Sequence, residues 1–130
     1  MGWFDQLIGK RCQRRALILI QKGNVLEDAG LLDQSLQCYQ DAVRQSPKLA
    51  RAHMSCGNIW IANGDVQAAL AAYMTAISLD PNYAAAYYNL GNAHLAQGNQ
   101  NAAIVAYKTA IELRPDFTDA HLALGCARED

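Results

Sequence analysis

Asparagine residues recur along this chain at a fixed interval of 34 residues, at Asn24, Asn58 and Asn92. A side-chain amide both donates and accepts hydrogen bonds, so evenly spaced amides can pair with the backbone of an extended peptide whatever its side chains. The alternative is that each asparagine bonds to a neighbouring unit of its own chain and orders the structure, because buried polar groups usually have such partners. Both roles can hold for the same residue.

Other reactive side chains do not form a recognisable catalytic pattern. No serine or cysteine stands in evident register with a histidine and a carboxylate, and the glycines follow the 34-residue interval instead of forming a phosphate-binding loop. The histidines His53, His94 and His121 fall at packing positions, and a general base also needs a correctly placed partner. The sequence predicts that the chain is not an enzyme and that it holds no cofactor.

The cysteines give no sign of a metal site. Cys12, Cys38, Cys56 and Cys126 form no CxxC pair and are irregularly spaced, so neither bound zinc nor a disulfide framework is predicted. Free thiols suit a reducing compartment, and we expect a cytoplasmic location. The amino terminus lacks a long apolar core with a cleavage site behind it, so no secretory signal is expected.

The charges are spread unevenly, although the formal net charge is only -1. Between Ala52 and Tyr107 the charged residues are Asp65 and Asp80. Binding to a phosphate backbone needs clustered cations, so nucleic acid is not an expected partner. Transmembrane helices need about 18 or more consecutive apolar residues, and the apolar run that starts at Ala16 is already interrupted by Gln21.

The 34-residue interval belongs to a whole repeating unit. Residues 50–83 and 84–117 share 15 identities in 34 positions, residues 16–49 form a weaker copy, and residues 118–130 begin another. A period of this length indicates a solenoid of paired helices. Residues 1–15 precede the first unit as a separate amphipathic and basic helix.

The glycines and prolines of each unit predict where its helices end. Gly30, Gly64 and Gly98 should adopt the left-handed conformation that ends the first helix, at position 15 of the unit. Asp65 and Asn99 should then cap the second helix, and a proline ends it. The first unit has Leu31 at the cap position, so its second helix is expected to begin late, near Asp33.

A glycine also recurs inside the first helix, at position 8 of each unit. Glycine there costs about 1 kcal/mol relative to alanine, so a close approach of the partner helix must offset it. Small residues and a large tyrosine are available on that partner helix. The glycines are Gly23, Gly57, Gly91 and Gly125, and the tyrosines are Tyr39, Tyr73 and Tyr107.

These residues resemble the tetratricopeptide repeat family. That family has a large residue at position 4, Leu at 7, a small residue at 8, aromatic residues at 11 and 24, Ala at 20 and 27, and Pro at 32, and the third unit departs from this pattern with His94 at position 11. The resemblance covers residues 16–130, and it implies an all-α fold, a right-handed α-solenoid superhelix of antiparallel helix pairs. The inner asparagines are also similar to those in repeats of O-linked N-acetylglucosamine transferase-type proteins. The third unit supplies Tyr87, Leu90, Gly91, Ala103, Tyr107, Ala110 and Pro115.

Helical geometry separates the packing residues from the candidate binding residues. Positions 4, 7, 8 and 11 share one face of the first helix, while positions 2, 5, 9 and 12 lie roughly 130° away. That second face should line the concave wall of the superhelix, which solenoids offer to ligands. A carboxylate clamp is not favoured, because Arg51 is the one cation at positions 2, 5 and 6. The predicted groove residues are Ile20, Asn24, Glu27, Arg51, Met54, Asn58, Ile61, Tyr88, Asn89, Asn92 and Leu95.

The function that follows from this face is a protein-interaction scaffold that binds a peptide or helix of a partner. One alternative is that the chain is the substrate-recruiting part of a larger enzyme such as a glycosyltransferase, since Gly125 is useful only if a further helix packs on it. The other is self-association, with Trp3, Phe4, Leu7 and Ile8 docking into a neighbouring copy.

Those four residues are first expected to cover the apolar end of the first unit. The less favoured reading is contact of residues 3–15 with a membrane surface or a partner, since Lys10, Arg11, Arg14 and Arg15 follow directly. Myristoylation of Gly2 is not expected, because Gln6 stands where that signal needs Ser or Thr.

Overall fold

The protein folds into seven helices, with no strand among the described residues 2–128 of the computed structural model. This confirms the predicted all-α class. The helices are α1 (Gly2–Asp28), α2 (Leu32–Gln45), α3 (Ala50–Ala62), α4 (Val66–Leu79), α5 (Ala84–Ala96), α6 (Gln100–Leu113) and α7 (Thr118–Arg128).

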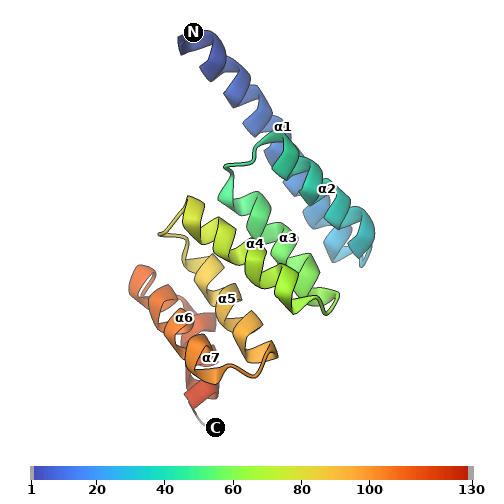
Figure 1. The fold of residues 1–130 in the computed structure, drawn as a ribbon. Coiled ribbons are helices and arrows are strands. Elements are labelled where there is room, and N and C mark those ends of the chain that lie inside the picture. The colour runs from blue at the N-terminus through green and yellow to red at the C-terminus, as the bar shows by residue number, and fades with distance from the viewer. Residues whose placement is uncertain (1, 129–130) are drawn as a thin grey trace.

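The helices stack in chain order as a solenoid. α1 pairs with α2, α3 with α4, and α5 with α6 (Figure 1). The second helix of each pair packs on the first helix of the next pair, and α6 packs on α7 in the same way. The first helices of neighbouring pairs also touch, since α1 contacts α3 and α3 contacts α5. Among residues 2–128 the second helices make no comparable contacts with one another, so the stack curves toward α1, α3 and α5.

The turn within each pair follows the sequence. Gly30, Gly64 and Gly98 have φ of +80°, +83° and +81°, the left-handed region that glycine enters without steric cost. The side chains of Asp65 and Asn99 accept hydrogen bonds from the amides of Ala68 and Ala102, at 3.1 and 3.3 Å. The glycine stops and both caps are therefore confirmed.

The start of α2 differs from the prediction. Leu31 provides no side-chain cap, yet α2 begins at Leu32, the same repeat position at which α4 and α6 begin. Leu32 and Leu36 pack against the core formed by α1 and α2. Burial of these apolar side chains stabilises the first turn in place of a cap, since most helical stability in proteins comes from packing.

The core of each pair is a tyrosine placed against a glycine. Tyr39, Tyr73 and Tyr107 are 0–1% exposed. A Cβ added at Gly23, Gly57 or Gly91 would come within 2.5–2.6 Å of the ring of the tyrosine in the same pair. The predicted close approach is present, and the nearest group is the aromatic ring itself.

In the first pair, a serine replaces the alanine that the other pairs carry at the helix crossing. Ser35 is fully buried, and its hydroxyl donates a hydrogen bond of 2.7 Å to the carbonyl of Gly23. The polar group is therefore satisfied at the crossing, and the approach of Tyr39 to Gly23 is as close as that of the tyrosines in the other pairs.

The first half of α1 corrects a prediction. Residues 1–15 were expected to form a separate short helix, whereas α1 runs unbroken from Gly2 to Asp28 and its first turns project past the other helices (Figure 1). Trp3 and Phe4 are 74% and 57% exposed, and Leu7 and Ile8 are also exposed, so these residues do not cover the first unit. Within residues 2–128 no helix has the length and apolar character needed to cross a membrane.

Candidate functional site

The three asparagines are held by the core tyrosines. The hydroxyl of Tyr39 donates to Oδ1 of Asn24 at 2.5 Å, that of Tyr73 to Asn58 at 2.7 Å, and that of Tyr107 to Asn92 at 2.6 Å. Each bond joins residues 15 positions apart, on the first and second helices of one pair. The partner is therefore in the same unit, which corrects the alternative that each asparagine bonds to a neighbouring unit.

These bonds fix which way each amide points. The tyrosine O–H uses the carbonyl oxygen of the amide, so the Nδ2 group with its two hydrogens is left to donate elsewhere. Asn24, Asn58 and Asn92 are half-buried, which leaves part of each side chain accessible. Sequence reasoning named the asparagines but missed the tyrosines as the groups that orient them. The signal was present, because both residues recur with the same interval.

The environment keeps the tyrosines protonated. Burial raises the pKa of Tyr107 to about 12, and burial is also the main reason that the pKa values of Tyr39 and Tyr73 lie above their usual range. Ionisation of a buried hydroxyl is unfavourable because the charge would lose its hydration. The hydroxyls therefore keep their protons at neutral pH, and those of Tyr73 and Tyr107 donate to Asn58 and Asn92.

The first pair has an additional acceptor at this place. The hydroxyl of Tyr39 also lies 2.8 Å from Oε1 of Glu27, and this carboxylate further raises the pKa of Tyr39. A hydroxyl carries one proton, so Asn24 and Glu27 compete for it. At the corresponding positions α3 has Ile61 and α5 has Leu95. At this repeat position the candidate face is thus acidic on α1 and apolar on α3 and α5.

The other predicted groove residues differ in how accessible they are. Arg51 and Leu95 are exposed, whereas Met54, Ile61, Tyr88 and Asn89 are half-buried. Ile20 corrects the prediction, because it is 1% exposed and lies in the core between the first two pairs, unavailable to a ligand.

Position 5 of the unit serves the stacking of the repeats. Ile20, Met54 and Tyr88 all occupy it, and each packs toward the following unit. The Tyr88 ring lies 5.1 Å from that of Phe117 and 5.9 Å from that of Tyr107, measured between centroids. Met54 packs beside Leu70 and Tyr73 in the next core cluster. These side chains mainly hold neighbouring units together.

Two of the histidines make hydrogen bonds to the backbone of the protein itself. Nε2 of His53 lies 2.7 Å from the carbonyl oxygen of Pro47, and Nε2 of His121 lies 2.7 Å from that of Pro115. Both rings therefore stabilise the turn that precedes their helix. His121 is exposed in the described structure, so it is not in the core, which was one of the two packing locations predicted for the histidines, core or interface.

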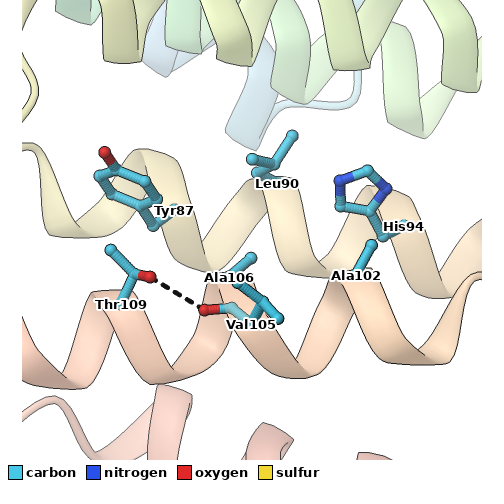
Figure 2. A pocket seen from close by; sticks show the side chains of 7 residues that line it. All are labelled: Tyr87, Leu90, His94, Ala102, Val105, Ala106 and Thr109. Atoms are coloured by element: carbon cyan, nitrogen blue, oxygen red, sulfur yellow. Dashed lines mark hydrogen bonds between the residues drawn. The ribbon is translucent and has the colours of Figure 1, made fainter.

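A shallow depression of about 300 Å³ lies between α5 and α6, away from the candidate face. Figure 2 shows Tyr87, Leu90 and His94 on α5 above Val105 and Thr109 on α6. At the position of His94, α3 carries the larger Trp60. Nδ1 of His94 is buried without a hydrogen-bond partner. No predicted groove residue lines this depression.

Two observations bear on metal binding and on thiol reactivity in the part of the chain that the structure describes. No three His, Cys, Asp or Glu side chains within residues 2–128 are grouped to hold a metal ion. Burial raises the pKa of the Cys56 thiol to about 11, so it stays protonated and is a poor nucleophile at neutral pH.

Three solved structures show how closely this fold is shared. The first TPR of Spaghetti (RPAP3), bound to the HSP90 peptide SRMEEVD, is 23% identical with a TM-score of 0.85, over 90% of this chain and 93% of that one. The Arabidopsis OM64 TPR domain is 18% identical with a TM-score of 0.86, over 91% and 98%. A crystal structure of MamA is 30% identical with a TM-score of 0.80, over 98% and 78%.

Sequence comparison leads to the same fold. A search among curated proteins finds no match. The family model described as TPR repeat matches residues 57–98 and 91–129, which together span more than half of the chain. The chain therefore belongs to the TPR repeat family.

Proposed function

We propose that the face of α1, α3 and α5 binds an extended or helical segment of another protein, and that the chain is a non-enzymatic interaction module. The observation that carries this proposal is the set of tyrosine–asparagine hydrogen bonds at Asn24, Asn58 and Asn92. They orient three amides in advance, and pre-orientation lowers the entropy cost of binding. TPR domains are interaction scaffolds, and a structural neighbour binds a peptide.

The amide nitrogens supply the hydrogen bonds of this interaction. Each Nδ2 can donate to a backbone carbonyl, and such a bond does not depend on the side chains of the ligand. Ile61 and Leu95 provide apolar contact between these amides, with further contributions from the exposed parts of Met54 and Tyr88. Asn89, one turn before Asn92, can add another amide.

The charge of the face selects a ligand that is not acidic. The peptide bound by the RPAP3 domain contains two glutamates and an aspartate, as its sequence SRMEEVD shows. On the present chain Arg51 is the single cation among the predicted groove residues, while Glu27 is an anion. Charge-assisted hydrogen bonds to several carboxylates are therefore lacking. We expect a neutral or basic segment with apolar side chains.

The structure suggests a sharper substitution than alanine for testing the amides. An Asn→Ala change would leave the tyrosine hydroxyl without its acceptor and lower stability. In the Asn58→Asp/Asn92→Asp variant, each side chain keeps an acceptor oxygen for the tyrosine but loses the N–H donors. Peptides selected on the wild-type protein from a random displayed library should bind this variant about tenfold or more weakly, because each lost hydrogen bond contributes about 0.5–1.5 kcal/mol.

A matched control places the same number of polar changes on the opposite wall. Gln67 and Asn101 are exposed on α4 and α6, and the double change Gln67→Glu/Asn101→Asp should leave peptide affinity unchanged. Circular dichroism would verify the fold of both variants. Peptides that bind Asn58→Asp/Asn92→Asp as tightly as wild type would refute the groove assignment, as would a selection that yields acidic peptides.

Two further proposals concern a second candidate function and the cellular location of the protein. The similarity of the asparagine ladder to O-linked N-acetylglucosamine transferase-type repeats favours, as a second candidate, a substrate-recruiting role beside a catalytic domain. A glycosyltransferase domain encoded in the same reading frame would support it. A cytoplasmic location is also proposed, because the free thiols Cys12, Cys38, Cys56 and Cys126 suit a reducing compartment, and imaging of a fluorescent fusion tests it.

A further inference from the structure

The outward face of α1 combines large apolar side chains with arginines. At about 100° per residue, nine exposed apolar or basic residues between Trp3 and Lys22 fall within an arc of about 140°, roughly opposite the buried side of the helix that carries Ala16, Ile20 and Gly23, while the exposed Lys10 and Leu17 lie outside it. No acidic residue lies within this arc. The residues on it are Trp3, Phe4, Leu7, Ile8, Arg11, Arg14, Arg15, Ile18 and Lys22.

The two kinds of side chain occupy successive turns. Trp3, Phe4, Leu7 and Ile8 lie on the first turns, and Arg11, Arg14 and Arg15 follow within about 18 Å of Trp3 along the axis, at 1.5 Å per residue. Asp5 is the one acidic residue before Glu27. This part of α1 is therefore strongly basic, in a chain whose formal net charge is -1.

Among residues 2–128 no other helix covers this face. Gly9 and Cys12 line a small depression together with Gln45 and Pro47 at the end of α2, and residues 3–8 precede this depression along α1. In Figure 1 the first turns of α1 extend past α2. The projecting turns can therefore approach a flat surface without the repeats interfering.

We infer that the outward face of α1 binds an anionic membrane surface, with its apolar side chains inserted among the lipids and its arginines at the phosphates. Tryptophan and phenylalanine favour the boundary between headgroups and acyl chains. Arginine side chains can extend from that depth to phosphate groups and pair with them bidentately. This interaction is separate from the proposed peptide face and does not depend on it.

Vesicles of phosphatidylcholine alone and vesicles that also contain phosphatidylserine test the inference. The full chain should sediment with the anionic vesicles and much less with the neutral ones. Each cation near an anionic surface contributes about fivefold in affinity, so Arg11→Gln/Arg14→Gln/Arg15→Gln should bind about 100-fold more weakly. Binding should also weaken with added salt, because screening shortens the range of the attraction.

The apolar part of the face has its own readout. Trp3→Ala/Phe4→Ala should reduce binding to anionic vesicles by about tenfold or more, since both side chains lose insertion into the lipid. Trp3 is one of two tryptophans, so the wild-type emission should shift to shorter wavelength on anionic vesicles and the shift should be lost in Trp3→Phe.

Matched controls change the same kinds of exposed residue elsewhere. Met74 and Val105 are 60% and 63% exposed on α4 and α6, and Met74→Ala/Val105→Ala should bind vesicles like the wild type. The same holds for Lys48→Gln/Lys108→Gln/Arg128→Gln, which removes three exposed cations outside α1.

Several outcomes would overturn the inference. They are equal binding to neutral and anionic vesicles, equal losses in the control variants, or no binding to either vesicle. A rise in solution mass with protein concentration that Trp3→Ala/Phe4→Ala abolishes, without vesicle binding, would assign the face to a second copy of the chain instead.

Discussion

Glycines at the same repeat position have two different surroundings in this molecule. At Gly57 and Gly91 an added Cβ would lie 2.6 and 2.5 Å from a tyrosine ring, whereas at Gly125 it would meet nothing within 4 Å. All three hold position 8 of their unit, and all three lie inside helices. The comparison separates the intrinsic cost of glycine in a helix from the packing that offsets it.

In the α3–α4 and α5–α6 pairs the glycine makes room for the tyrosine, and the tyrosine in turn orients the asparagine of the candidate face. The core and the candidate face are thus linked through a single side chain. On α7 the glycine has no such role in the described structure, and its cost of about 1 kcal/mol is not offset. The following predictions test this distinction.

The largest effect is expected at alkaline pH, because ionisation affects the buried tyrosine of each of the three helix pairs at once. A tyrosine pKa that is higher in the folded state means that its contribution to stability is complete below pH 10 and is lost as pH rises through the folded pKa, about 12 for Tyr107. Helical ellipticity should therefore fall as the pH rises above 10 and towards 12. Because the chain has six tyrosines, ellipticity and not total tyrosinate absorbance is the readout, and helices that stay intact well above pH 12 would contradict the prediction.

The Tyr107→Phe variant controls this experiment. At neutral pH it should be less stable than the wild type, because its hydrogen bond to Asn92 is lost. Above pH 12 the order should reverse, since phenylalanine has no proton to release.

Removal of one core ring should have the next largest effect. Tyr73→Ala is expected to lower the free energy of unfolding by about 3–5 kcal/mol, since a fully buried aromatic side chain leaves a cavity beside Gly57. Leu122 on α7 is 64% exposed, and Leu122→Ala should change stability by less than about 0.5 kcal/mol. Urea denaturation of both variants compares the two regions directly, and equal losses would be inconsistent with it.

Alanine at the glycines should have effects of opposite sign. Gly57→Ala is expected to destabilise by about 1–3 kcal/mol, because the methyl group clashes with a ring that is buried and hydrogen-bonded. Gly125→Ala should stabilise by up to about 1 kcal/mol, since there is open space and alanine is the better helix former.

A double-mutant cycle identifies the cause. In the Tyr73→Ala background the clash is gone, so Gly57→Ala should cost much less than it does in the wild type. Equal costs in both backgrounds would show that the ring is not what the methyl group meets.

The smallest effect concerns the tyrosine hydroxyl alone. Tyr73→Phe keeps the ring against Gly57 but removes the bond to Asn58, and it should cost about 0.5–1.5 kcal/mol in urea denaturation. A loss as large as that of Tyr73→Ala would mean that the hydroxyl, rather than the ring, is the main contribution.

Local features were predictable because local chemistry decides them. Gly64 and Gly98 stop helices because the left-handed conformation favours glycine, and Asp65 and Asn99 cap helices through amides three residues away. The recurring interval of 34 residues also determined that the helices stack in pairs. α2 was predicted less well, because packing replaced the missing cap.

The remaining features depend on contacts between distant residues, which a pattern of residue types does not specify. Position 9 indicated a polar rung, but only the fold placed a tyrosine hydroxyl from 15 residues further on against each amide oxygen. The fold likewise buried Ile20 and left Trp3 uncovered. Both residues have an apolar side chain on α1, and what distinguishes them is whether another helix lies beside that turn.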